Sequence, residues 1–203
     1  MVDKMQINRL KEESILLRCK WAIILLPFLS IYLMPISVYG QTSEYDVKVF
    51  LLLKISEYIE WPEQSEINNK LEPFVIGVIG ENPFGTLLED TYQKEKNKIK
   101  NKNVEIRYYT EPNQIDQCHI LFISSAEKNR LADILFNTHG KSVLTLGDTK
   151  NFGENGVHIN FYILKNKIRF ELNESSITNE GFSVDYRLRN IAKIVGSRKG
   201  ETH

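Results

Sequence analysis

The sequence predicts an α/β fold: a single three-layer domain with a mostly parallel central sheet, then a C-terminal β-hairpin followed by a helix. Two observations predict this class. Segments that are apolar on both faces alternate with amphipathic segments at helical spacing, which is typical of parallel strands covered by helices. Residues 156–173, GVHINFYILKNKIRFELN, instead alternate apolar and polar side chains on both sides of a short turn, which indicates an antiparallel hairpin.

The first forty residues are predicted to be an export signal. Residues 1–20 contain five Lys or Arg and three Asp or Glu, and residues 21–43 carry no charge. This basic segment, the apolar run and the small residues Ser37 and Gly40 match a signal peptide cleaved after Gly40. An uncleaved membrane anchor is the alternative, although no basic cluster follows the apolar run. In both cases residues 41–203 are predicted to be exported, to the periplasm, and to form one domain.

Composition and residue spacing argue against several classes of function. Without residues 1–40, 21 basic and 23 acidic residues remain, and this balance argues against bulk binding of nucleic acid. Cys118 is then the only cysteine, so it forms no internal disulfide and is expected to be a buried apolar residue. The glycines near residues 77–85 lack the dinucleotide-binding spacing, and the histidines share no ligand spacing. We therefore expect no cofactor and no metal.

The other elements follow from local patterns. A helix is predicted over residues 43–61, with Val47 in its apolar stripe and Lys48 on the opposite side. Strands are predicted at residues 73–80, 104–109, 120–123 and 142–146. A second helix follows from residue 124 to 135, and a last helix is predicted over residues 183–195.

The hairpin provides the first candidate site. A tip at Lys165-Asn166 fixes the register. One face then carries three apolar pairs: Ile163 with Ile168, Phe161 with Phe170, and Ile159 with Leu172. The other face carries three polar pairs: Tyr162 with Arg169, Asn160 with Glu171, and His158 with Asn173. This polar face is either a binding site or the solvated outer face of a half-buried sheet.

The turn at Ser124 and Ser125 provides the second candidate site. It follows an apolar strand, and ligands of open α/β sheets bind beyond the carboxyl ends of strands, so it could take a small anionic or zwitterionic ligand. Capping of the following helix is the structural alternative. A serine hydrolase using His158 or His119 is the enzymatic alternative, but no Gly-x-Ser-x-Gly motif surrounds these serines. We expect no catalytic residues.

Several blocks of sequence occur together over residues 44–195. They are YIEWP, PFVIGVIGENPFG, CHILFISSAEKNRL, SVLTLGDTKNF, INF and KIRFELN. In content and order they resemble the YfiR family of small exported bacterial proteins, whose domain also occurs in some sensor kinases. The resemblance implies a compact α/β domain with no assigned catalytic residue. It also implies repression of an inner-membrane diguanylate cyclase from the periplasmic side.

The resemblance also implies site residues. The matching polar positions are Asn160, Arg169, Glu171 and Asn173 in the hairpin, and Ser124, Ser125 and Glu127 in the strand-to-helix turn. Val157 and His158 depart from the glycine and methionine usual in the family, which would reshape a pocket near the hairpin.

These observations lead us to expect an exported, non-enzymatic regulator or sensor. It would bind the periplasmic domain of an inner-membrane signalling protein, a small ligand, or both, and repress the partner's output. A homodimer is left open as its assembly. The remaining alternative is a structural or adhesive module that pairs through an exposed edge strand.

Overall fold

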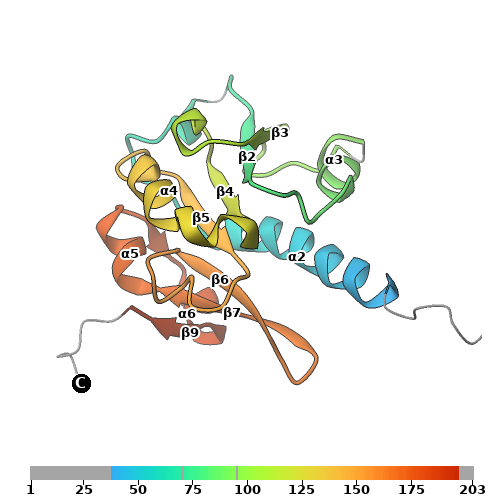
Figure 1. Ribbon diagram of the computed structural model, residues 1–203. Coiled ribbons are helices and arrows are strands. Elements are labelled where there is room, and N and C mark those ends of the chain that lie inside the picture. Colours follow the sequence, from blue (N-terminus) through green and yellow to red (C-terminus); the bar gives the residue numbers. More distant parts are fainter. Residues whose placement is uncertain (1–37, 70, 95, 197–203) are drawn as a thin grey trace, which may run out of the picture. The chain divides into compact units, whose positions relative to one another are not determined.

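The computed structural model describes residues 38–69, 71–94 and 96–196 (Figure 1). The chain divides into two units, residues 1–41 and 42–203, and the description below concerns the second. Most of the predicted signal peptide lies outside the described residues, and its cleavage point falls within the first described helix, so the leader stays a prediction. Within the described ranges, no helix has the length and apolar character needed to cross a bilayer.

A seven-stranded sheet with the order β3-β2-β4-β5-β6-β7-β9 forms the centre of the domain. Its strands are β2 (Phe74–Ile79), β3 (Val104–Tyr109), β4 (Ile120–Ile123), β5 (Leu144–Gly147), β6 (Ile159–Leu164), β7 (Lys167–Asn173) and β9 (Lys193–Val195). The strands from β3 to β6 pair in parallel, β7 runs antiparallel to β6, and β9 is parallel to β7. This confirms the predicted, mostly parallel sheet. A separate two-stranded sheet joins β1 (Ile59–Glu60) and β8 (Ser183–Val184).

Helices cover both faces of the sheet, which confirms the three layers. On one face, α2 (Val38–Tyr58) packs into a core that includes Ile76 and Val78. On the other face, α4 (Leu131–Thr138) packs on Val75 and Ile79 of the same strand. The shorter helices are α3 (Leu87–Glu89), a π-helix at Asp90–Lys94, 3₁₀ helices at Glu66–Asn68, Pro112–Gln114 and Ser125–Arg130, α5 (Glu174–Asn179) and α6 (Tyr186–Ile191).

The buried face of α2 differs from the prediction. Val47 and Phe50 are 43% and 57% exposed, whereas Lys48, predicted to face outward, is only 2% exposed. The core side instead carries Val49, Leu52 and Ile55. Because three consecutive leucines give the helix apolar residues on several sides, spacing alone could not fix its rotation.

The last predicted helix is also wrong over half its length. It is helical only in α6, which is capped by Asp185, whose side chain accepts a hydrogen bond from the Arg187 backbone at 2.8 Å. The chain becomes extended at Ala192, and β9 then pairs with β7. This pairing covers the edge that β7 would otherwise leave open. The strand pairing therefore overrides the helical spacing of residues 192–195.

The predicted register of the hairpin is confirmed. Ile163 pairs with Ile168, Asn160 pairs with Glu171, and the intervening pairs follow. Lys165 and Asn166 both have positive φ angles, 50° and 57°, as a type I′ turn requires. The hairpin projects beyond the end of β5 (Figure 1).

Candidate functional site

A pocket of about 450 Å³ lies at the carboxyl edge of the sheet. Its walls come from α2, the β6–β7 hairpin, β9 and the loop that follows β5, and we call it the hairpin pocket. Asn160 enters it because its Cα is the cross-strand partner of Gly147, the last residue of β5, and Asp148 follows directly. The parallel register therefore brings the hairpin to the edge where open α/β sheets bind ligands.

The hairpin wall contains a buried network of hydrogen-bonded polar side chains. Asn160 is 2% exposed, and its amide nitrogen donates to Glu171 Oε2 at 3.0 Å. The other carboxylate oxygen of Glu171 accepts from Lys193 Nζ at 2.8 Å. Asn160 Oδ1 is buried and has no hydrogen-bond partner among the described residues. This part of the polar face is therefore not a solvated outer surface, and it carries an unused acceptor.

The α2 wall holds a second charged group. Lys48 Nζ lies 2.6 Å from Asp148 Oδ2 and 2.5 Å from Glu44 Oε1. The Tyr45 hydroxyl donates to the same Asp148 oxygen at 3.0 Å. Burial, and then the charge of Asp148, raise the pKa of Tyr45, so its hydroxyl stays protonated. Burial of Lys48 is tolerated because two carboxylates surround its ammonium group.

The loop after β5 packs closely against β7 at a glycine. A Cβ atom at Gly153 would lie 2.7 Å from Glu171 Oε2 and 3.3 Å from Val195. The Gly153 carbonyl also accepts a 2.7 Å hydrogen bond from Asn173 Nδ2. Only a residue without a side chain lets the loop approach β7 this closely.

The lining carries charges of both signs. Its carboxylates are Glu44, Asp148, Glu154 and Glu171, and its ammonium groups are Lys48, Lys150 and Lys193. Lys48 and Lys193 are engaged in ion pairs within the wall. Lys150 and Glu154 are exposed and make no ion pair with any other described residue. They are the charges of the lining that a ligand could engage without breaking a wall contact.

Three of the predicted hairpin residues line this pocket: Asn160, Tyr162 and Glu171. Arg169 is exposed and pairs with Tyr162, but it is not part of the lining. His158 and Asn173 are buried away from it and bind backbone groups.

Those two residues have structural contacts. His158 Nδ1 accepts from the Thr145 backbone at 3.0 Å, and burial lowers the pKa of His158 to about 4. Asn173 Oδ1 accepts from the Ser176 backbone at 2.9 Å, which caps α5.

The Ser124 turn is a separate place. Ser124 is buried, and its Oγ accepts from the Ala126 backbone at 3.4 Å, which confirms the capping role. Glu127 is 5% exposed and binds Arg130 through two hydrogen bonds of 2.8 and 3.0 Å. Ser125 is exposed. None of the three predicted residues is among those that line the hairpin pocket, so the structure does not unite the two candidate sites.

The contacts do not support the serine-hydrolase alternative. His119 Nδ1 accepts from the Val75 backbone at 2.9 Å, its ring stacks on Phe74, and burial lowers its pKa to about 4. The described part of the chain contains no hydrogen bond from Ser124 or Ser125 to a histidine. Within the same ranges, no group of three or more His, Cys, Asp or Glu residues could hold a metal ion. Cys118 is buried as predicted, and burial raises its pKa to about 12.

The adhesive alternative gains no support either. One edge of the seven-stranded sheet is β3, where Glu105 and Arg107 form a 2.7 Å ion pair. The other edge is β9, which has only three residues. Charged or very short edges oppose pairing with another sheet.

Sequence reasoning missed Lys48, Asp148 and Lys193. Asp148 could have been found, because it directly follows a buried parallel strand. Lys48 was assigned to the outer side of its helix, and Lys193 fell within the predicted last helix. The pocket carboxylates that they contact, Asp148 and Glu171, are 100 and 22 residues away in the chain.

The fold and the pocket define a small α/β domain with a mixed-charge pocket at the carboxyl edge of its sheet. The sequence profile of the YfiR/HmsC-like family matches residues 45–193. The chain belongs to this family.

A comparison with curated proteins finds no match. Among solved structures, the chain is similar to an ABC domain from Streptococcus pneumonia in complex with L-Trp. That match has a TM-score of 0.46 and 9% identity, and it covers 60% of this chain and 56% of that chain.

Proposed function

We propose that this protein is an exported, non-enzymatic regulator that represses a signalling protein of the inner membrane, either a diguanylate cyclase or a sensor kinase. Membership of the YfiR/HmsC-like family over residues 45–193 is the observation that carries the proposal. The predicted signal peptide supports a periplasmic location. The partner would be recognised through its periplasmic domain.

The hairpin pocket is the proposed recognition site. Its rim exposes Ile163 (55%) and Leu164 (52%) on the projecting end of the hairpin. Exposed apolar side chains beside a polar pocket are typical of surfaces that bind another protein. Arg169 lies on the same projection and would contribute a rim contact.

A small zwitterionic ligand fits the pocket better than a simple anion. The lining carries one more carboxylate than ammonium groups, which disfavours a purely negative ligand. Lys150 could bind a ligand carboxylate, Glu154 a ligand amine, and Asn160 Oδ1 could accept a hydrogen bond from a ligand N–H. A ligand that binds free protein more tightly than partner-bound protein would release the partner, whereas one with equal affinity would change nothing. The Ser124–Glu127 turn stays a second candidate contact for the partner.

Co-purification tests the repressor role. The tagged full chain is cross-linked in cells, and detergent-solubilised membranes are passed over the affinity resin. We expect recovery of a membrane protein that carries a cyclase or kinase output domain. Recovery of no such protein under any cross-linking condition would contradict the proposal.

A cellular measurement adds the direction of the effect. If the partner is a cyclase, deletion of the gene raises cyclic di-GMP, and the intact gene restores the low level. Tyr162→Ala removes a half-buried side chain of the pocket, so we expect it to restore the low level poorly. Lys167→Ala, at an exposed position of the same hairpin outside the lining, is the matched control and should restore it fully. If both variants behave like the wild type, the pocket is not the site.

A further inference from the structure

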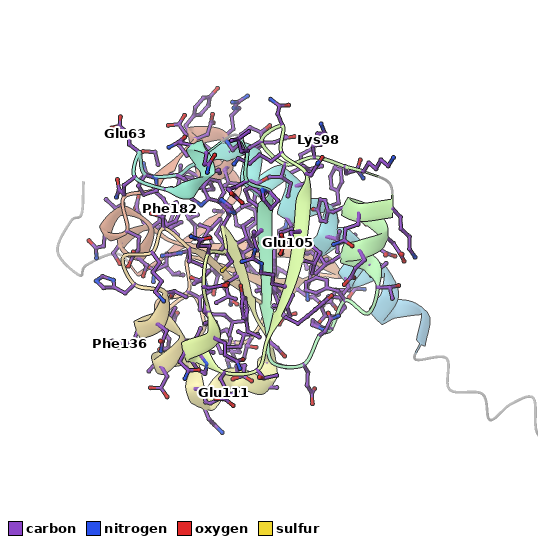
Figure 2. The ribbon with its side chains drawn as sticks, turned by 90° about the horizontal axis from the view of Figure 1, so that it is seen from above. Glu63, Lys98, Glu105, Glu111, Phe136 and Phe182 are labelled. Carbon is purple, nitrogen blue, oxygen red and sulfur yellow. The ribbon has the colours of Figure 1, made fainter. Side chains whose placement is uncertain are left out.

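A second pocket, of about 560 Å³, lies at the opposite edge of the sheet. We call it the Trp61 pocket. Trp61, Asn68, Lys100 and Lys102 are among its lining residues, which come from the segments that precede β2 and β3. It therefore lies at the amino edge of these strands. Figure 2 shows Glu63 and Lys98, which belong to the same two segments, at one end of the domain, and Glu111, which follows β3, at the other end.

Trp61, which lines the pocket, carries a buried hydrogen-bond donor without an acceptor among the described residues. Trp61 is 9% exposed, and its ring packs edge-on against Phe74 and Phe182, with ring centroids 5.7 and 5.8 Å away. Its Nε1–H group is buried and has no hydrogen-bond partner among the described residues. Native proteins rarely leave such a donor unpaired, so an acceptor from outside the chain is expected here.

A cation lies over the ring that carries this donor. The Lys100 ammonium group is 5.9 Å from the centroid of the Trp61 ring. Lys100 is exposed and makes no ion pair with another residue of the described chain. Lys102 also lines the pocket, and its ammonium group donates a hydrogen bond to the Glu72 carbonyl. The positive charge of Lys100 therefore favours an anion as the ligand.

The backbone that carries Lys100 forms a strained turn. Lys100 and Asn101 have left-handed backbone angles, with φ of 51° and 62°. The flanking residues Ile99 and Lys102 exchange two backbone hydrogen bonds, of 3.2 and 2.9 Å. Ile99 is fully buried, and Lys102 Nζ donates to the Glu72 carbonyl at 3.0 Å. Such angles persist in non-glycine residues only where the surroundings fix them, and they are frequent at binding sites.

We propose that the Trp61 pocket binds an oxyanion, a phosphate or carboxylate group, with the Trp61 indole N–H donating to it and Lys100 supplying the opposite charge. The oxyanion could belong to a free small molecule or to a lipid headgroup. A water molecule could pair with the indole, but it would leave the charge of Lys100 without an opposite charge. This site is separate from the hairpin pocket, and its occupancy does not depend on the repressor role.

The test uses Trp61 as its own reporter. The sequence has two tryptophans, so Trp21→Phe in the detergent-solubilised full chain leaves Trp61 as the only indole. The indole N–H resonance is followed by NMR during titration with sodium phosphate or sodium acetate, with sodium chloride of equal ionic strength as reference. Tryptophan emission is followed with vesicles of phosphatidylglycerol and, separately, of phosphatidylcholine.

We expect phosphate or acetate to shift the indole resonance saturably while chloride does not. If only phosphatidylglycerol vesicles change the emission, the oxyanion comes from a lipid. Lys100→Gln should weaken the response about tenfold, as expected for loss of a charge-assisted contact. Lys98→Gln, at an exposed position of the same loop outside the lining, should leave the response unchanged. Circular dichroism checks that both variants fold.

Three results would overturn this proposal. One is no response of Trp61 to phosphate, acetate or either vesicle. Another is the same response in Lys100→Gln as in the parent chain. The third is an equal response to chloride, because it would show general screening by salt instead of a specific oxyanion site.

Discussion

The side-chain amide of Asn160 donates a 3.0 Å hydrogen bond to Glu171 on the neighbouring strand. Lys193, one strand further on, binds the other oxygen of the same carboxylate at 2.8 Å. One hydrogen-bonded network of side chains therefore links three strands. It ends at Asn160 Oδ1, which has no partner among the described residues. All three residues line the hairpin pocket, so this hydrogen-bonded network should affect both stability and recognition.

Replacing Glu171 with alanine tests how much this hydrogen-bonded network contributes to stability. The change leaves the buried Asn160 amide without its acceptor and frees Lys193, so we expect the free energy of unfolding to fall by about 1–3 kcal/mol. Glu105→Ala is the matched control, because Glu105 pairs with Arg107 at a more exposed edge, and it should cost less. Urea unfolding of the three proteins measures the difference. An equal loss of unfolding free energy in both variants would mean that the network contributes no more than an exposed ion pair.

Lys48→Met tests the α2 wall. It keeps most of the side-chain volume but removes the ammonium group between Asp148 and Glu44, so we expect a loss of about 3 kcal/mol from the uncompensated carboxylates. Lys54→Met removes a more exposed pair with Glu57 on the same helix and should have a smaller effect. The readout is again the midpoint of urea unfolding. Adding Asp148→Leu to Lys48→Met should recover part of the loss, and no recovery would argue against the pairing.

The hairpin turn offers a stabilising change. Lys165 and Asn166 occupy left-handed backbone conformations, in which Asn-Gly is the preferred pair of a type I′ turn. The double change Lys165→Asn and Asn166→Gly should raise stability by roughly 1 kcal/mol. Thermal unfolding followed by circular dichroism measures it. A lower melting temperature would contradict the turn geometry.

Stability should decline in mild acid. Burial lowers the pKa of His119 and His158 from 6.5 to about 4, with Lys102 and Arg107 adding to the effect at His119. Between these values the unfolded chain binds protons that the folded chain does not, so this contribution is fully present above the unfolded pKa and is lost as the pH falls toward the folded pKa.

Urea unfolding at several pH values measures this slope. His119→Phe can keep the stacking on Phe74 while it removes one titrating group. The absolute stability of this variant should fall, because the Val75 backbone loses its acceptor. Its slope between pH 6.5 and about 4 should nevertheless be shallower. An unchanged slope would show that His119 is not kept neutral by the fold.

Much of the fold could be predicted because residues close together in the sequence determine it. The alternation from Val157 to Asn173 fixed which residues of the hairpin face each other, since a shift by one residue would have placed aromatic side chains opposite charges. The strand at residues 120–123 was predictable because a short apolar run belongs to a strand buried on both faces. Neither inference needed knowledge of a distant segment.

The site was only partly predictable because its contacts are long-range. Lys48 is buried by an aspartate 100 residues away, and nothing in the helix itself marks that partner. Lys193 faces Glu171 because β9 adds to the sheet, although its own segment has helical spacing. Tertiary pairing decides both positions, and local spacing cannot report it.

The central claim is that this protein recognises a membrane signalling protein through the hairpin pocket. Site-specific photo-cross-linking in living cells tests it most directly, with the reactive residue placed either at Tyr162 in the pocket or at Phe136, an exposed residue of α4 outside the pocket lining. The account predicts that Tyr162, and not Phe136, yields an adduct with a membrane protein that carries a cyclase or kinase domain. No adduct at Tyr162, or the same adduct from both positions, would contradict it.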